Sequence, residues 1–181
     1  MRKPPHIIEI FLQPGELWFG DRHTRVRTIL GSCVAATLWH PDLLVGGMCH
    51  YMLAARPGVG GPQPDGRYGD EALAVLAEQV RATGRPVHEF EAKLFGGGNM
   101  FAHAARPGTG AALRVSDANV VAGRALLQRH GFQLKAEHVG GDGHREVFLD
   151  LWSGHAWVKH SAPSACGGLP AAETAAQKRN L

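Results

Sequence analysis

Glycine is the residue type that most constrains how this chain can fold. Of its 181 residues, 24 are glycine, and many of them separate short apolar runs. Glycines in this number favour tight turns and close approaches between backbone segments, and they disfavour a helical bundle. They follow no fixed period, which excludes a collagen-like or low-complexity chain. A chain of this length corresponds to one domain, and it can bury about 70% of its unfolded surface.

Short runs rich in β-branched and aromatic residues predict a series of strands. They are expected at residues 6–12, 16–19, 25–30, 33–39, 44–53, 87–95, 132–139, 145–151 and 156–160. The first two are expected around a turn at Pro14–Gly15, and Pro41–Asp42 predicts another turn before residue 44.

Two segments show helical spacing of apolar residues, at about 71–83 and 117–130. The expected N-caps are Asp70 and Ser116, and the expected stops are Gly84 and Gly131. The residues expected to face inward are Leu73, Leu76, Val80, Val120, Val121, Leu126 and Leu127.

Strands outnumber helices and hairpins are frequent, which predicts a mixed α/β domain of the α+β class with much antiparallel pairing. We expect the domain to span residues 1–160. The composition of residues 161–181 shifts to Ala, Pro, Ser and Gly, so a disordered tail is expected there, with Cys166 incidental.

Charge and cysteine content exclude several classes of protein. The net charge is +3 without a long basic run, so nucleic-acid binding is not expected. Three cysteines in a chain of this length fit a reducing compartment and no disulfide framework. The apolar stretch Ile7–Leu12 is too short for a signal peptide, and no run reaches the ~20 apolar residues of a membrane span. We therefore expect a cytoplasmic protein without membrane insertion.

The tetrapeptide Leu30-Gly31-Ser32-Cys33 is the first candidate for chemistry. A cysteine directly after a glycine turn lies beside exposed backbone N–H groups, which can lower a thiol pKa and later hold an oxyanion. The alternative is a small buried hydrophobic residue, which a free cysteine usually is.

The spacing of the following hairpin supports the catalytic interpretation. If residue 40 pairs with residue 43, Cys33 lies directly opposite His50 on the same face, with Cβ atoms roughly 4.5–5.5 Å apart. That separation suits a thiolate–imidazolium pair. The alternative for His50 is a core histidine hydrogen-bonded to backbone.

Other interpretations of this region are weaker. Cys49 and His50 are adjacent on a strand and point to opposite faces, and they lack the second ligand pair that a zinc site needs. Glycine turns at 46–47, 96–98 and 140–143 lack P-loop or dinucleotide-binding signatures. They are expected either to wall a site that accepts another protein's side chain or to be ordinary hairpin turns.

Taken together and in order, these segments resemble the chemoreceptor glutamine deamidase (CheD) family over about residues 7–160. The segments that carry the resemblance are 28–35 (TILGSCVA), 46–53 (GGMCHYML), 93–101 (KLFGGGNMF), Asn119 and 139–145 (VGGDGHR). The resemblance implies a single-domain layered sandwich of mixed, largely antiparallel sheets flanked by helices, similar to toxin-type glutamine deamidases.

The resemblance also implies the activity, which is hydrolysis of specific glutamine carboxamides on the helical cytoplasmic bundle of methyl-accepting chemotaxis receptors. It implies no cofactor and no metal. Some members of the family bind a chemotaxis phosphatase of the CheC type, so such a partner is expected, and the protein itself is expected to be a monomer.

In this family the nucleophile maps to Cys33 and its partner histidine to His50. A third family residue, a threonine, is expected six positions before the cysteine, where this chain has Arg27; Thr28 stands five positions before it. One step along a strand reverses the face, so the assignment to Thr28 or Arg27 stays open here.

The expected mechanism begins with attack of the Cys33 thiolate on the carboxamide and continues through a thioester, with His50 as acid and then base. Backbone N–H groups around Gly31 and Ser32 would hold the oxyanion. The substrate pocket is expected to include Gly46, Gly47, Gly97, Gly98 and Asn99. The same acyl-enzyme would form from a glutamate methyl ester, so methylesterase activity is a side reaction to expect. Two rivals stay open: a binding module with little catalysis, and a thiol-dependent amidase acting on other proteins.

Overall fold

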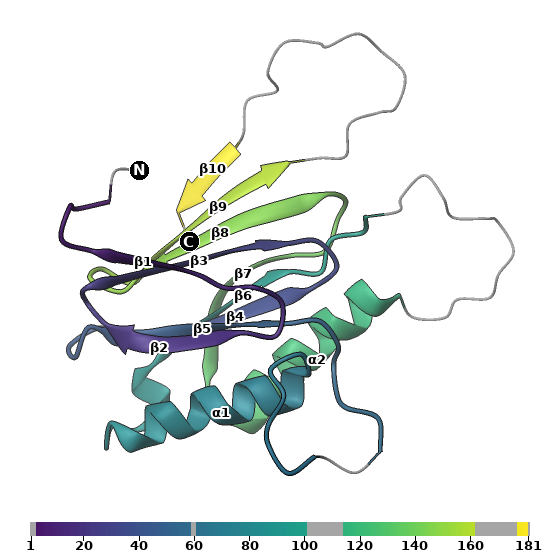
Figure 1. Ribbon diagram of the computed structural model, residues 1–181, viewed down its shortest axis with the longest axis horizontal. Helices are drawn as coiled ribbons and strands as arrows, with labels where there is room; N and C mark the ends of the chain where they lie inside the picture. Colours follow the sequence, from purple (N-terminus) through teal and green to yellow (C-terminus); the bar gives the residue numbers. More distant parts are fainter. Residues whose placement is uncertain (1–2, 59–60, 101–113, 162–176, 181) are drawn as a thin grey trace, which may run out of the picture.

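The computed structural model describes residues 3–58, 61–100, 114–161 and 177–180. In these residues, ten strands form two five-stranded sheets, shown in Figure 1. The first sheet has the order β1 (Ile8–Phe11), β3 (Thr24–Leu30), β8 (His144–Asp150), β9 (His155–Ser161) and β10 (Gln177–Asn180). The second has the order β2 (Leu17–Asp21), β5 (Val45–Tyr51), β4 (Val34–His40), β6 (Glu91–Gly96) and β7 (Gln133–Val139).

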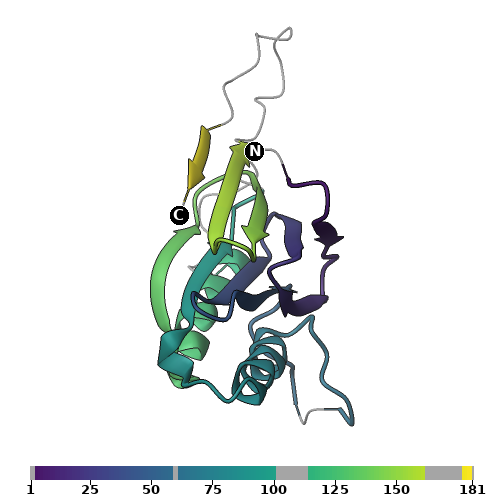
Figure 2. The ribbon, with the colours of Figure 1, turned by 90° about the vertical axis from the view of Figure 1, so that its left-hand side faces the viewer.

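The molecule is layered. The helices α1 (Gly69–Ala82) and α2 (Val115–Arg129) pack on the outer face of the second sheet, as Figures 1 and 2 show. One apolar cluster lies between this sheet and the helices, and another lies between the two sheets. Pairing is antiparallel except for β1 with β3 and β6 with β7. The predicted layered α+β sandwich of mixed sheets is confirmed.

The first two strands do not form a hairpin around Pro14–Gly15. β1 pairs parallel to β3 in the first sheet, whereas β2 pairs antiparallel to β5 in the second. The turn therefore carries the chain from one sheet to the other. The N–H of Gly15, at φ 89°, donates to the carbonyl of His50, which ties this turn to β5.

The predicted hairpin register is wrong by two residues. His40 pairs with Val45, and Ala35 lies opposite His50. The loop contains four residues and closes through a hydrogen bond from Leu44 N–H to His40 O, with Leu44 in the left-handed region at φ 53°. A shift of two residues leaves each side chain on its predicted face of the sheet, because side chains alternate between the two faces with period two.

The helix stops were predicted correctly and the starts were not. Gly84 and Gly131 follow the two helices at φ 73° and φ 87°. The N-caps are Tyr68 and Arg114, neither of which makes a side-chain capping bond. Asp70 and Ser116, the predicted caps, instead lie within the first helical turns.

The buried helical stripes agree with the periodicity at all but one position. The predicted residues that are buried are Leu73, Leu76, Val80, Val120, Leu126 and Leu127. Val121 is 54% exposed, because one step around a helix rotates a side chain by about 100° away from its neighbour. The predicted strand at 87–95 begins only at Glu91, since Val87–Glu89 form a 3-10 turn.

Part of the predicted disordered tail is a strand. Ser161 ends β9, and β10 pairs antiparallel with β9 at the edge of the first sheet. An edge strand presents unpaired backbone groups that a further strand can use. Residues 162–176 and 181, including Cys166, lie outside the described residues. In the described part of the chain, neither helix has the length and apolarity needed to cross a membrane.

Candidate active site

Cys33 lies in a loop that crosses from one sheet to the other. β3 of the first sheet ends at Leu30, and β4 of the second begins at Val34. Between them, the half-buried Cys33 packs against the apolar cluster that separates the sheets. Ala35 contributes to the same cluster and lies opposite His50. Cys33 packs against the same cluster as Ala35, so it lies on the side of the second sheet where His50 lies.

The backbone carbonyl groups of residues 31–33 all accept hydrogen bonds. Gly98 N–H donates to Gly31 O at 2.7 Å, and Gly97 N–H donates to Cys33 O at 2.8 Å. The side-chain amide of Asn119 donates to Ser32 O at 3.2 Å. Within the described chain, the N–H groups of Ser32 and Cys33 donate to no other residue. The Cys33 N–H interacts with its own sulfur, and neither N–H is held by a backbone carbonyl of another described residue.

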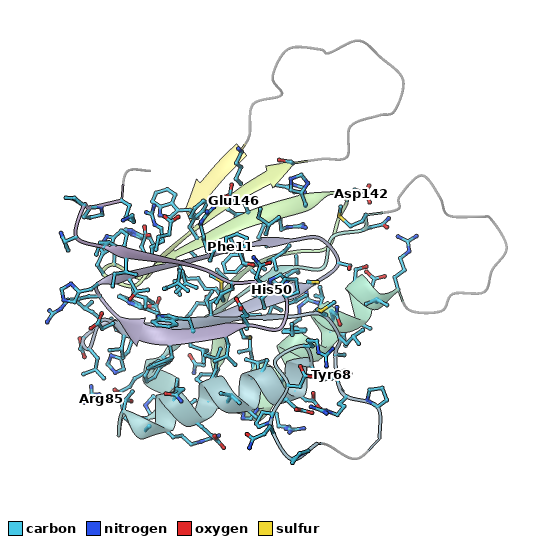
Figure 3. The ribbon with its side chains drawn as sticks, viewed as in Figure 1. Phe11, His50, Tyr68, Arg85, Asp142 and Glu146 are labelled. Atoms are coloured by element: carbon cyan, nitrogen blue, oxygen red, sulfur yellow. The ribbon has the colours of Figure 1, made fainter. Side chains whose placement is uncertain are left out.

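His50 comes from β5, is 2% exposed, and lies between the two sheets, as Figure 3 shows. Its Nδ1 is 2.7 Å from Thr28 Oγ1, and the Thr28 hydroxyl donates to Leu12 O at 2.8 Å. A hydroxyl has one proton, so with that proton on Leu12 its oxygen accepts the Nδ1–H of His50. The remaining nitrogen, Nε2, is then an unprotonated base. It is buried and has no hydrogen-bond partner among the described residues.

Thr28, and not Arg27, faces His50. Thr28 is fully buried on the inner face of β3. Arg27 points to the outer face, where it pairs with Glu9 at 2.8 Å and Glu146 at 3.2 Å. Its guanidinium also lies 4.9 Å from the ring centre of Phe11, which Figure 3 labels with Glu146. Of the two residues left open by the sequence, Thr28 is the one that contacts His50, because faces alternate along β3.

Burial determines the protonation of the pair. It lowers the pKa of His50 to about 4, against smaller opposing effects from the Leu12 carbonyl and the Glu16 charge. It also raises the pKa of the Cys33 thiol, with the residue's own backbone N–H acting in the opposite direction. Both shifts favour a thiol and a neutral imidazole over the expected thiolate–imidazolium pair.

The second cysteine of the region has a different environment. Cys49 is fully buried in the cluster beneath the helices, on the face of β5 opposite to His50. Burial raises the pKa of its thiol to about 12. Cys49 therefore has neither the access nor the acidity of a nucleophile.

The glycines predicted to line the substrate pocket lie in two different places. Gly97 and Gly98 adjoin the Cys33 loop through the hydrogen bonds described above. Gly46 and Gly47 pair with Trp39 and Leu38, towards the far end of β4, so they do not rim the Cys33 site. A Cβ at either position would lie 2.2 Å from a neighbouring carbonyl oxygen, so both are glycine because strands approach closely there.

Asn99 is held by the facing turn. Its backbone N–H donates to Gly141 O, and its side-chain amide donates to Asp142 Oδ1 at 3.2 Å. The expected hydrogen bond from this amide to a substrate would have to compete with Asp142. Within the described ranges, no group of three or more His, Cys, Asp or Glu side chains could hold a metal ion.

Asn119 is a site residue that the sequence indicated only as part of the resemblance, without its place in the site. Asn119 is 1% exposed on the face of α2 that packs against the second sheet. The available signal was a polar residue in the buried stripe next to Val120.

The fold and site define a class of protein: a layered α+β domain with a thiol, an imidazole and a hydroxyl gathered around one inter-sheet crossing. The sequence profile described as "CheD chemotactic sensory transduction" matches residues 52–160. The chain belongs to the CheD family.

Relatives in this family cover nearly the whole chain. The "Probable chemoreceptor glutamine deamidase CheD" of Pseudomonas syringae pv. tomato is 49% identical over 160 residues, which is 88% of this chain and 94% of the relative. "Probable chemoreceptor glutamine deamidase CheD 3" of Dechloromonas aromatica is 45% identical, over 86% of this chain and 89% of the relative. A more distant relative, from Leptospira interrogans, is 32% identical over 87% of this chain and 95% of its own length.

Proposed function

We propose that this chain deamidates glutamine side chains to glutamate on the cytoplasmic domains of chemotaxis receptors. The observation that carries the proposal is the Thr28–His50 hydrogen bond, which leaves Nε2 of His50 free as a base on the side of β5 that faces Cys33. The names of the relatives, chemoreceptor glutamine deamidases, support the choice of reaction and substrate.

The reaction starts from the neutral pair. As the Cys33 sulfur attacks the carboxamide carbon, its proton moves to Nε2 of His50, and the N–H groups of Ser32 and Cys33 stabilise the oxyanion. The imidazolium then protonates the departing nitrogen, so ammonia leaves and a thioester remains. Water attacks the thioester while His50 takes its proton. The glutamate product leaves, and the sulfur regains its proton.

The low basicity of His50 has a consequence for this mechanism. An imidazole with a pKa near 4 is a weak base but, once protonated, a strong acid. It is therefore well suited to protonating the leaving nitrogen. A glutamate methyl ester would give the same thioester, so methylesterase activity is part of the proposal.

The proposal extends to location and partners. The enzyme acts in the cytoplasm as a monomer on the helical receptor bundle, with a CheC-type phosphatase as a further partner. The contact between Thr28 and His50 supports catalysis over a module that only binds.

Mass spectrometry of purified receptor cytoplasmic domains, with and without the full chain, tests the proposal. We expect glutamine-to-glutamate conversion with ammonia release, and we expect Cys33→Ala to abolish both. Cys49→Ala is the matched control and should retain activity, because Cys49 lies on the opposite face of β5. Wild-type protein that converts no receptor glutamine, or Cys33→Ala with more than a few per cent of wild-type activity, contradicts the proposal.

A further inference from the structure

Asn119 connects the loop that carries Cys33 to the strand that carries His50. Its Nδ2 donates to Ser32 O at 3.2 Å and to Met52 O at 2.7 Å, so each amide hydrogen has a partner. The backbone carbonyl of Asn119 in turn accepts a hydrogen bond from the hydroxyl of Tyr51 at 2.8 Å. One side chain of α2 thus holds both segments of the candidate site.

The bond to Ser32 O determines where the next N–H points. No cis peptide bond occurs in the described residues, so the Ser32–Cys33 peptide is trans and planar. In such a peptide the C=O and the N–H point in opposite directions. Asn119 draws the Ser32 carbonyl towards the helix layer. The Cys33 N–H is consequently directed to the other side of the second sheet, where Cys33 packs and His50 lies.

One polar atom of the Asn119 side chain takes no part in these contacts. Its Oδ1 is buried and has no hydrogen-bond partner among the described residues. A buried acceptor without a partner is unfavourable, and such a group requires an explanation. Reversing the amide would place its oxygen against two carbonyl oxygens, so the orientation follows from the neighbours.

We propose that Asn119 is a positioning residue for the oxyanion site. By holding the Ser32 carbonyl, it keeps the Cys33 N–H aimed at the oxygen of the tetrahedral intermediate. The inference rests on the proposed function, since it assigns a role within that reaction. Asn119 itself touches no reacting atom.

The experiment compares two reactions of the same thiol. Deamidation passes through an oxyanion, whereas alkylation of Cys33 by iodoacetamide is a direct displacement at carbon and forms none. Asn119→Ala should lower kcat for receptor deamidation by roughly 10- to 100-fold, within the range seen for residues that orient a catalytic group or donate to an oxyanion. KM and the rate of Cys33 alkylation should stay within about twofold of wild type.

Tyr51→Phe is the matched control. It removes a hydrogen bond to the carbonyl of Asn119 but leaves the bond to Ser32 O in place. Its kcat should stay near the wild-type value even if its melting temperature falls. A kcat loss in Tyr51→Phe equal to that in Asn119→Ala would assign the effect to docking of α2, and the inference would be wrong.

A second variant covers the case in which Asn119→Ala does not fold. Asn119→Asp has nearly the same shape and should show the same loss of kcat with unchanged alkylation. The inference is overturned if a folded variant keeps wild-type kcat, if kcat and alkylation fall together, or if neither variant folds. A wild-type protein that alkylates at Cys33 but deamidates no receptor would instead overturn the proposed function.

Discussion

Thr28 Oγ1 and His50 Nδ1 lie 2.7 Å apart across the space between the two sheets. The contact joins β3 of one sheet to β5 of the other, and it selects the tautomer in which Nε2 is the base. The contact forms where the chain crosses from one sheet to the other. β3, which carries Thr28, leads through the short Cys33 loop into β4, and β4 pairs with β5, which carries His50.

Removing the Thr28 hydroxyl should impair catalysis more than folding. We expect Thr28→Ala to lower kcat for deamidation by roughly 10- to 100-fold, because the imidazole loses the group that sets its tautomer and orientation. Steady-state ammonia release measures the effect. Thr28→Ser keeps the hydroxyl and should retain most of the rate. Arg27→Ala removes a side chain on the outer face and should change kcat little; a larger loss there than in Thr28→Ala would contradict the assignment.

The protonation of Cys33 can be measured through its alkylation rate as a function of pH. Burial raises the pKa of this thiol and lowers that of His50 to about 4, and both shifts disfavour an ion pair near neutral pH. We expect the rate of Cys33 alkylation, followed on its own peptide by mass spectrometry, to be low near neutral pH and to rise only above the pKa range of an ordinary thiol. A rate that reaches its plateau below pH ~6 would indicate a resting thiolate–imidazolium pair.

His50 should make the folded state sensitive to acid. Its pKa is about 4 in the folded protein, below the 6.5 of an unperturbed histidine, so the unfolded chain binds the extra proton between these values. The contribution of His50 to the free energy of unfolding is fully present above pH ~6.5. It is lost as the pH falls towards 4, by at most about 1.4 kcal/mol per pH unit.

Urea unfolding of wild type and His50→Gln at several pH values isolates this contribution. Glutamine does not titrate, so the free energy of unfolding of the variant should lack the part of the acid slope that comes from residue 50. The wild-type protein should therefore lose more stability than the variant between pH ~6.5 and ~4. Equal slopes would show that His50 titrates normally in the folded state.

Gly98 should be required for stability as well as for the site. A Cβ there would lie 2.1 Å from the Gly143 carbonyl oxygen, so Gly98→Ala must move backbone and disturb the hydrogen bond to Gly31 O. We expect a loss of at least about 2–3 kcal/mol in unfolding free energy, with deamidation and Cys33 alkylation both altered.

Gly140→Ala is the comparison for Gly98→Ala. Gly140 lies in the facing turn with φ 71°, but a Cβ there would meet no atom within 4 Å. Only the left-handed backbone is then penalised, by about 1–2 kcal/mol. Thermal and urea unfolding of both variants test the difference, and equal stabilities would mean that the close approach at Gly98 relaxes without cost.

The sequence alone was sufficient wherever a property depends on neighbouring residues. The buried stripe of Leu73, Leu76 and Val80 follows from helical periodicity, and the glycine stops follow from the left-handed backbone that ends each helix. The predicted register of the hairpin was wrong by two residues, but Cys33 and His50 still lie on the same side of the sheet, because side chains alternate between faces with period two.

Only the tertiary structure decided the contacts that join distant segments. The separation of β1 and β2 into different sheets, the choice of Thr28 over Arg27, and the bond from Asn119 to Ser32 each depend on how strands and layers pair. The same holds for protonation. Burial lowers the pKa of His50 and raises that of Cys33, and it is produced by both sheets closing over the site. Local sequence carries neither the partner of a strand nor the depth at which a side chain is buried, because both arise from packing between residues far apart in the chain.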